Sequence, residues 1–239
     1  MNINKFIFLL QQNYYINVLI FSLEFFAIAL AIKNSKKETK NLTLLFILFL
    51  LLDSTFLFFD IFLLSTPGIH KDFKIKFISV TNTILGIVEL IVYFKYFSYT
   101  LNNNRVRKIF AVIQNTIIPF SLLIIALIIL RPSNTMEYAA NLFGGFELIL
   151  LIPPCIIYFQ RLLSIESEEL LFSRPSFWIT SGLFFYAAST VPYYLIKEYL
   201  QSTRYPYRSD IATAFYYIPI LANLVFLIFA FRCKKPLTT

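Results

Sequence analysis

The stretch LTLLFILFLLLDSTFLFFDIFLL, residues 42–64, decides the fold, because Asp53 and Asp60 are its only charged residues. A transmembrane helix needs about 20 consecutive, mostly apolar residues. Comparable runs recur along the whole chain, and charged or turn-forming residues separate them. The runs cover residues 15–32, 42–64, 77–99, 109–130, 139–162, 176–197 and 211–232. The sequence therefore predicts an all-α integral membrane protein, a single bundle of seven transmembrane helices.

The composition of the chain supports this prediction independently of where each apolar run begins and ends. Of its 239 residues, 58% are hydrophobic and only 14% are charged, whereas a soluble domain carries about 25% charged residues. The connections between the runs are short, so we expect residues 15–232 to form one bundle without a soluble domain. Residues 1–14 are predicted to be a short N-terminal segment at the membrane interface, and residues 233–239 a cytoplasmic tail.

The basic residues predict the orientation of the bundle. If the N-terminus is outside, the inner connections carry 12 cations and the outer ones 8, and cytoplasmic loops are the more basic ones. We therefore expect the N-terminus to lie outside and the C-terminus in the cytoplasm. The inner cations are Lys33, Lys36, Lys37, Lys40, Arg105, Arg107, Lys108, Arg161, Arg174, Arg232, Lys234 and Lys235.

Several function classes fit the sequence poorly. The net charge of +8 lies in short connections, where contact with lipid headgroups explains it without nucleic acid. The two cysteines, Cys155 and Cys233, have no metal-ligand spacing, and we expect no metal, no cofactor and no disulfide. A retinal protein would need a lysine midway along residues 211–231, and none is present. Without a protease motif, we expect that the chain is not an enzyme.

Ionisable residues inside the predicted spans are the main functional signal. Each costs about 2.5–3.5 kcal/mol at mid-bilayer on the insertion scale, and their only basic companion is Lys95 at the end of a span. They must therefore be neutral and hydrogen-bonded, or line a wet cavity. The five acids are Glu24, Asp53, Asp60, Glu89 and Glu147.

Helical spacing indicates which polar groups share a face. Asn82, Glu89 and Tyr93 lie on one stripe of the third span. Asp60 and Glu147 are placed in the outer half of the membrane, where an acid pair in an aromatic pocket would suit a cationic or amine-bearing ligand. The predicted ligand-binding set is Glu89, Glu147, Asp60, Asn82, Tyr93, Tyr193 and Tyr216. Glu24, Asp53, Asn141 and Asn223 are predicted to be buried polar groups.

The alternatives to a ligand pocket stay open at this point. The acids could be protonated contacts between helices, worth about 0.6 kcal/mol each on average, or they could form a proton or ion pathway. The longest inner connection, 162–175, is an ordinary solvated loop or a docking surface for a cytoplasmic partner. Its candidate docking residues are Glu166, Glu168, Glu169 and Phe172.

Residues 175–186, PSFWITSGLFFY, follow Glu147 and a leucine-rich connection. In this arrangement the chain resembles a family of small membrane proteins of about seven helices from Bacteroidetes-type bacteria, which are similar to the input regions of sensor histidine kinases. Asn82 with Glu89, and Asn223 near the end of the last span, fit the same pattern. The family often has a histidine next to that asparagine, where this chain has Thr83, so the resemblance is weaker there.

The resemblance implies a membrane-embedded, receptor-like protein of the bacterial inner (cytoplasmic) membrane that signals through a separate partner, a histidine kinase. Two alternatives remain on sequence grounds, a small proton- or cation-coupled transporter and a structural subunit of a membrane complex. The ligand, the partner and the oligomeric state are not determined by the sequence.

Overall fold

The computed structural model describes residues 3–66, 70–101, 103–130, 133–164, 171–202, 208–233 and 235–237. Within these ranges, the side chains of 3–15, 133–141, 195–202, 208–215 and of a few single positions lie outside the description. All regular structure in the described part is helical. The long helices are α1 (Ile3–Lys33), α2 (Lys40–Ser65), α3 (Lys71–Thr100), α4 (Asn104–Leu130), α5 (Ser133–Leu163), α6 (Pro175–Ser202) and α7 (Arg208–Arg232), and the short 3-10 turns are η1 (Lys37–Thr39) and η2 (Leu171–Ser173).

The helices bear out the predicted fold class in its coarse form, an all-α membrane protein. Each predicted apolar run lies within one helix of the structure. Five helices have a described segment long and apolar enough to cross a membrane. These segments are Ile16–Lys33, Lys40–Asp60, Asp72–Thr100, Asn104–Leu127 and Leu142–Leu163, and Tyr216–Arg232 is a shorter apolar segment. The chain is therefore a multi-pass membrane protein.

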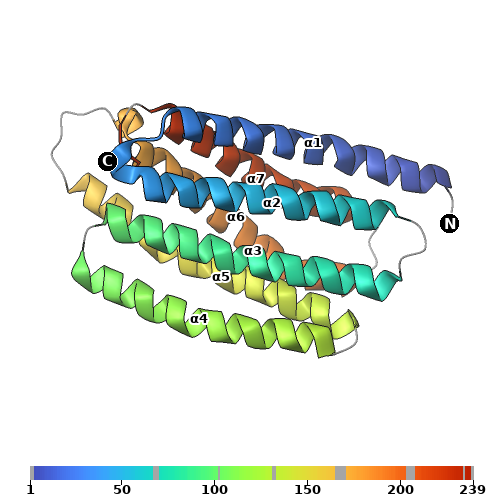
Figure 1. Cartoon of the computed structure of the whole chain (residues 1–239). Helices are drawn as coiled ribbons and strands as arrows, with labels where there is room; N and C mark the ends of the chain where they lie inside the picture. The colour runs from blue at the N-terminus through green and yellow to red at the C-terminus, as the bar shows by residue number, and fades with distance from the viewer. Residues whose placement is uncertain are drawn as a thin grey trace.

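The helices run up and down in one bundle, so that α1 begins at one end and α7 finishes at the other (Figure 1). The end where α1, α3, α5 and α7 finish carries Lys33, Arg161 and Arg232, and we call it the basic end. There Asn34 donates a hydrogen bond of 2.7 Å from its side-chain amide to the carbonyl of Phe231. This bond ties the connection after α1 to the end of α7, 197 residues later in the chain.

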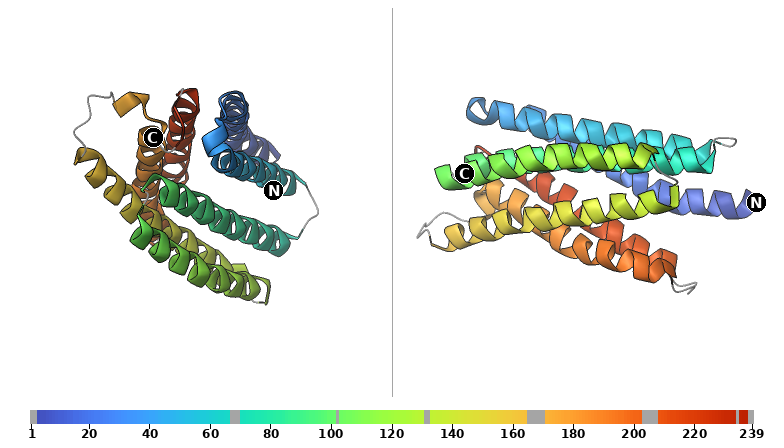
Figure 2. Two further views of the ribbon diagram at one scale, coloured as in Figure 1. Left: turned by 60° about the vertical axis from the view of Figure 1, so that its left-hand side comes forward. Right: turned by 90° about the horizontal axis from the view of Figure 1, so that it is seen from below.

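The contacts between helices form a closed ring with one helix outside it. Helix α1 packs on α2, α2 on α3, α3 on α5, α5 on α6, α6 on α7, and α7 on α1. Helix α4 contacts α3 and α5 from outside this ring (Figures 1 and 2). Only 17% of its span is buried, compared with 44% in the spans of α3 and α5. The side chains of α4 are therefore exposed mainly to lipid.

The core lies inside the ring and is rich in aromatic residues. Phe46 of α2 is completely buried and makes edge-to-face contacts with Tyr93 and Tyr96 of α3 and with Phe231 of α7, at centroid distances of 5.7, 6.0 and 6.1 Å. On the opposite face of α2, Leu48 is 53% exposed. Lipid is as apolar as leucine, so close packing of such inward groups holds the helices together. An apolar residue on the outer face needs no protein partner.

Candidate functional site

Two carboxyl groups meet between α3 and α5. The side chains of Glu89 on α3 and Glu147 on α5 are hydrogen-bonded to each other. A hydrogen bond between two carboxyl groups needs a proton on one of them, since an ionised carboxylate only accepts. Glu147 is 5% exposed, and its Oε1 accepts no hydrogen bond from a hydroxyl, amide or basic group of the described residues.

Gly86 makes this contact possible. It precedes Glu89 by one helical turn and lies under the carboxyl group of Glu147, so that a Cβ at this position would be 2.8 Å from the carboxyl carbon. No real Cβ approaches another carbon so closely, and any larger residue would displace Glu147. The glycine on α3 therefore provides the space that the acid from α5 occupies.

A second carboxyl pair lies between α1 and α2. Glu24 is completely buried, and its side chain is hydrogen-bonded to Asp53. Ser54, next in the chain, donates its hydroxyl hydrogen to Glu24 Oε2. The serine therefore satisfies one oxygen of a group that would be costly to bury alone.

The two pairs are connected across the bundle. Asp53 interacts electrostatically with Glu89, so the acids of α1, α2, α3 and α5 form one row along consecutive helices of the ring. None of the interactions of these four groups in the described part of the chain involves a lysine or arginine. The row is therefore not a set of salt bridges. Among the described residues, no group of three or more His, Cys, Asp or Glu side chains could hold a metal ion.

The remaining two helices of the ring, α6 and α7, bring tyrosines close to the Glu89–Glu147 pair. Tyr186 and Tyr194 of α6 interact electrostatically with both glutamates. Tyr216 of α7 interacts with Tyr194. The Tyr194 hydroxyl also lies close to α5, because a Cβ on Gly144 would be 3.3 Å from it. Carboxyl and phenolic oxygens side by side can both accept hydrogen bonds from a cationic group.

Tyr93 joins this site to α7. Its ring is buried, and its hydroxyl accepts a hydrogen bond of 3.4 Å from the side-chain amide of Asn223. Asn223 is 9% exposed, and its Oδ1 has no partner among the described residues. Both residues were predicted from the sequence to be buried or to line the site, and both lie inside the bundle.

Two predicted members of the ligand-binding set lie away from the pair. Asp60 was expected beside Glu147, but it is half-buried and hydrogen-bonded to Thr81 of α3. The reason is register: Asp60 follows Asp53 by seven residues on α2 and so lies about 10 Å further along the bundle. Asn82 is exposed, although the residues on either side of it are buried. It shares the stripe of Glu89, but lies seven residues earlier in the helix.

The remaining predicted residues are placed as follows. Tyr193 is half-buried and its ring contacts Tyr216 at a centroid distance of 5.6 Å. Phe172 lies at the basic end and is 65% exposed, and its carbonyl accepts a hydrogen bond of 2.8 Å from the indole of Trp178. The predicted docking residues Glu166, Glu168 and Glu169 and the side chain of Asn141 lie outside the described residues.

Sequence reasoning missed the residues of α6 that face the acids. It selected Tyr193 on this helix, whereas Tyr186, Thr190 and Tyr194 lie on the buried side at spacings of four. Thr190 is completely buried. This regular polar spacing is visible in the sequence and could have identified the correct face.

No family model, no curated protein and no solved structure matches this chain. The function has to be argued from the row of carboxyl groups and from its surroundings.

Proposed function

We propose that this chain is a receptor-like protein that binds a small cation or amine at the Glu89–Glu147 pair and signals through a separate partner. The observation that carries the proposal is the contact between the carboxyl groups of Glu147, which is buried, and Glu89, which is half-buried, inside a wall of tyrosines. In this proposal the bundle crosses a bacterial inner membrane seven times, with the N-terminus outside and the C-terminus in the cytoplasm.

The chemistry of the pair supports a cationic ligand. Two carboxyl groups in contact share a proton when nothing else neutralises them, because two adjacent carboxylates would repel each other. An ammonium group supplies three donors and a positive charge, so it can replace the proton and satisfy Glu147 Oε1, which accepts no donor in the described structure. A neutral ligand brings no positive charge, so the repulsion between two ionised carboxyl groups would remain.

The position of the tyrosine wall supports signalling. Tyr186 and Tyr194 belong to α6, and Tyr216 belongs to α7, and both helices contain an internal proline, Pro192 and Pro219. Proline removes a backbone hydrogen bond and allows a helix to bend. A ligand that contacts acids on α3 and α5 and rings on α6 and α7 binds two arrangements of these helices differently, which is the condition for shifting their populations.

The basic end supports the proposed orientation and the proposed partner. It carries Lys33, Arg161 and Arg232 of the positive-inside pattern, and Phe172, one of the proposed docking residues, is exposed there. We propose a histidine kinase as the partner, because the chain resembles kinase input regions in sequence. Transmission from α6 would reach this surface through Trp178, which lies in the first turn of the helix.

The binding part of the proposal can be tested on the purified full chain. Thermal stability is measured in detergent against ethylammonium and putrescine, with sodium chloride at equal ionic strength as the reference. We expect amine-dependent stabilisation in the wild type and in Asp60→Asn, a matched control that neutralises an acid outside the pair. We expect none in Glu147→Gln. Equal stabilisation of all three proteins would contradict the proposed site.

The signalling part needs a separate measurement in cells. A photo-reactive amino acid in place of Phe172 should crosslink to a kinase, and the yield should change when the amine is added. The same substitution combined with Glu147→Gln should keep the crosslink and lose the amine response. Crosslinks that are identical with and without amine would refute signalling, whatever the binding result.

A second candidate function, proton- or cation-coupled transport, is favoured by the continuity of the acid row. Glu24, Asp53, Glu89 and Glu147 succeed one another across four helices, and such chains of acids are used as proton relays. Liposomes containing the protein and a pH-sensitive dye decide between the two functions. Amine-driven proton movement that is lost in Glu89→Gln would support transport, and its absence together with amine binding would support the receptor.

A further inference from the structure

An open cleft of about 360 Å³ lies at the basic end, away from the carboxyl row. It is formed where α3 finishes, α4 begins and α5 approaches its last turn. The described residues that line it are Leu101, Asn103, Asn104, Val106, Ile157 and Arg161. None of the six is acidic, and the cleft has both a polar and an apolar part.

The polar part is built for an anion. Arg161 donates a hydrogen bond from its guanidinium to the carbonyl of Leu101, which fixes the side chain against the end of α3. A guanidinium has five N–H donors in a planar fork, so this bond leaves most of them for a ligand, and the fork matches phosphate geometry. Asn103 adds an amide, and its Oδ1 accepts a hydrogen bond of 2.9 Å from the backbone N–H of Arg105.

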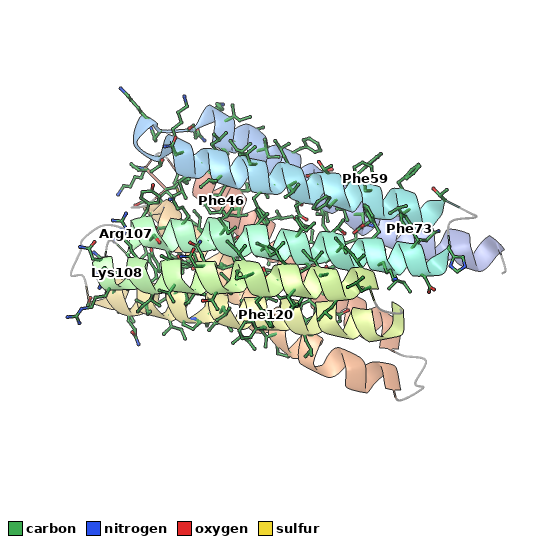
Figure 3. The ribbon with its side chains drawn as sticks, turned by 60° about the horizontal axis from the view of Figure 1, so that its bottom comes forward. Phe46, Phe59, Phe73, Arg107, Lys108 and Phe120 are labelled. Carbon is green, nitrogen blue, oxygen red and sulfur yellow. The ribbon has the colours of Figure 1, made fainter. Side chains whose placement is uncertain are left out.

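Three more cations surround the cleft without lining it. Arg105, Arg107 and Lys108 follow in the first turns of α4 and are all exposed. Figure 3 shows Arg107 and Lys108 at this end of the bundle, with their side chains extending outward. Their field adds to that of Arg161 and raises the local concentration of anions.

The depth of the cleft matches that of lipid headgroups. The apolar span of α3 finishes at Thr100 and that of α4 begins at Asn104, so Leu101 and Asn103 lie between two membrane-spanning segments. Val106 and Ile157, one turn further in, give the cleft an apolar wall. A lipid can contact both parts of the cleft, with its headgroup phosphate in the polar part and its acyl chains against the apolar wall. A free phosphate ion can contact only the polar part.

We infer that this cleft binds a phosphate-bearing anion between Arg161 and the start of α4, and that an anionic membrane lipid supplies it. This inference does not depend on the proposed function at the Glu89–Glu147 pair. Basic pockets between transmembrane helices bind such headgroups in other membrane proteins.

The test measures binding of phosphatidylglycerol to the purified full chain in a neutral detergent, by native mass spectrometry and by thermal stability. Phosphatidylcholine and inorganic phosphate are the comparison ligands. Arg161→Gln should weaken phosphatidylglycerol binding about tenfold, since a charge-assisted hydrogen bond contributes about 1.5–3 kcal/mol. Lys108→Gln changes the net charge equally but lies outside the cleft, and it should change the affinity less than about twofold.

A second variant keeps the test decisive if Arg161→Gln does not fold. Ile157→Trp fills the cleft and leaves every cation in place, and it should also abolish selective binding. Equal losses in Arg161→Gln and Lys108→Gln, or unchanged binding in Ile157→Trp, would overturn the proposal, because they would reduce it to general attraction at a basic surface. If inorganic phosphate competes at equal concentration, the anion site stands and its ligand is the free ion.

Discussion

The substitution Gly86→Ala should damage the carboxyl pair while leaving the fold almost intact. The new Cβ would lie 2.8 Å from the carboxyl carbon of Glu147 and 3.2 Å from its Oε1. These atoms are the far end of a flexible side chain, so the carboxyl group can turn away without moving α5. The movement breaks the hydrogen bond to Glu89.

The expected magnitude follows from two opposing contributions. Losing a hydrogen bond between membrane helices costs about 0.6 kcal/mol on average, and replacing glycine by alanine within a helix gains about 0.5–1 kcal/mol. We therefore expect the free energy of unfolding to change by less than about 1 kcal/mol, while the pair is disrupted.

Gly182→Ala is the matched control. Its Cβ would lie 2.6 Å from Cβ of Phe226 and 2.9 Å from Oδ1 of Asn223. The Cβ of Phe226 is fixed to the backbone of α7 and cannot turn away, so α6 and α7 must separate. Overpacking of this kind costs about 1–3 kcal/mol. This variant should lower stability and leave the Glu89–Glu147 contact in place.

The assay combines unfolding in mixed micelles with infrared spectroscopy of the protonated carboxyl C=O stretch. The wild type should show a hydrogen-bonded carboxyl band that Glu147→Gln removes. Gly86→Ala should shift this band to the frequency of a free carboxyl, and Gly182→Ala should not. An unshifted band in Gly86→Ala, or a larger loss of stability than in Gly182→Ala, would refute the argument that the glycine seats the acid.

Four further predictions concern single residues. Ser54→Ala removes the hydroxyl that donates to Glu24 and should lower the free energy of unfolding by about 1 kcal/mol, measured by unfolding in mixed micelles. No change would mean that the hydrogen bond to Asp53 alone is enough for the Glu24 carboxyl group. A membrane-impermeant maleimide should label Cys233 and not the buried Cys155, and only from the cytoplasmic face; labelling from outside would reverse the orientation. Burial raises the pKa of the Cys233 thiol, so less thiolate forms at neutral pH and the labelling rate should keep rising as the pH passes the value of an ordinary cysteine. A rate that levels off below that pH would contradict this. Phe229→Leu removes a ring stacked on Trp178, the single tryptophan, at a centroid distance of 4.9 Å. The tryptophan fluorescence should shift to longer wavelength, and an unchanged emission maximum would show that this ring does not shield the indole from solvent.

The sequence predicted the helices well because the bilayer imposes a length and a composition on each of them. It also singled out Glu89, which lies at the centre of the carboxyl row. What it predicted poorly was the rotation of α6. That helix has apolar residues on all sides, so hydrophobic periodicity does not reveal which face is buried. Tyr193 was chosen, although the next residue, Tyr194, is the one that interacts with both glutamates.

The pairing of the acids could not be predicted from the sequence alone. Glu147 was assigned to the outer half with Asp60, from the depth of each residue in its predicted span and the predicted orientation. In the structure α5 packs directly on α3, although α4 lies between them in the chain. This packing brings Glu147 to Glu89. Gly86 is the signal that could have pointed to the pair, because a glycine one turn before an acid inside a span marks a place where another group approaches the backbone.

The position of α4 outside the ring separates the two sites of the molecule. The carboxyl row and its tyrosines come from the six helices of the ring, and α4 contributes no ionisable group to them. Yet α4 forms one wall of the basic cleft and packs on α3 and α5, the helices that carry Glu89 and Glu147. A lipid held between Arg161 and the start of α4 would therefore press on the same two helices that form the carboxyl pair. The two sites can therefore be coupled through α3 and α5. Such coupling is reciprocal: if lipid binding changes the affinity of the pair for an amine, the amine must change the affinity of the cleft for the lipid by the same factor.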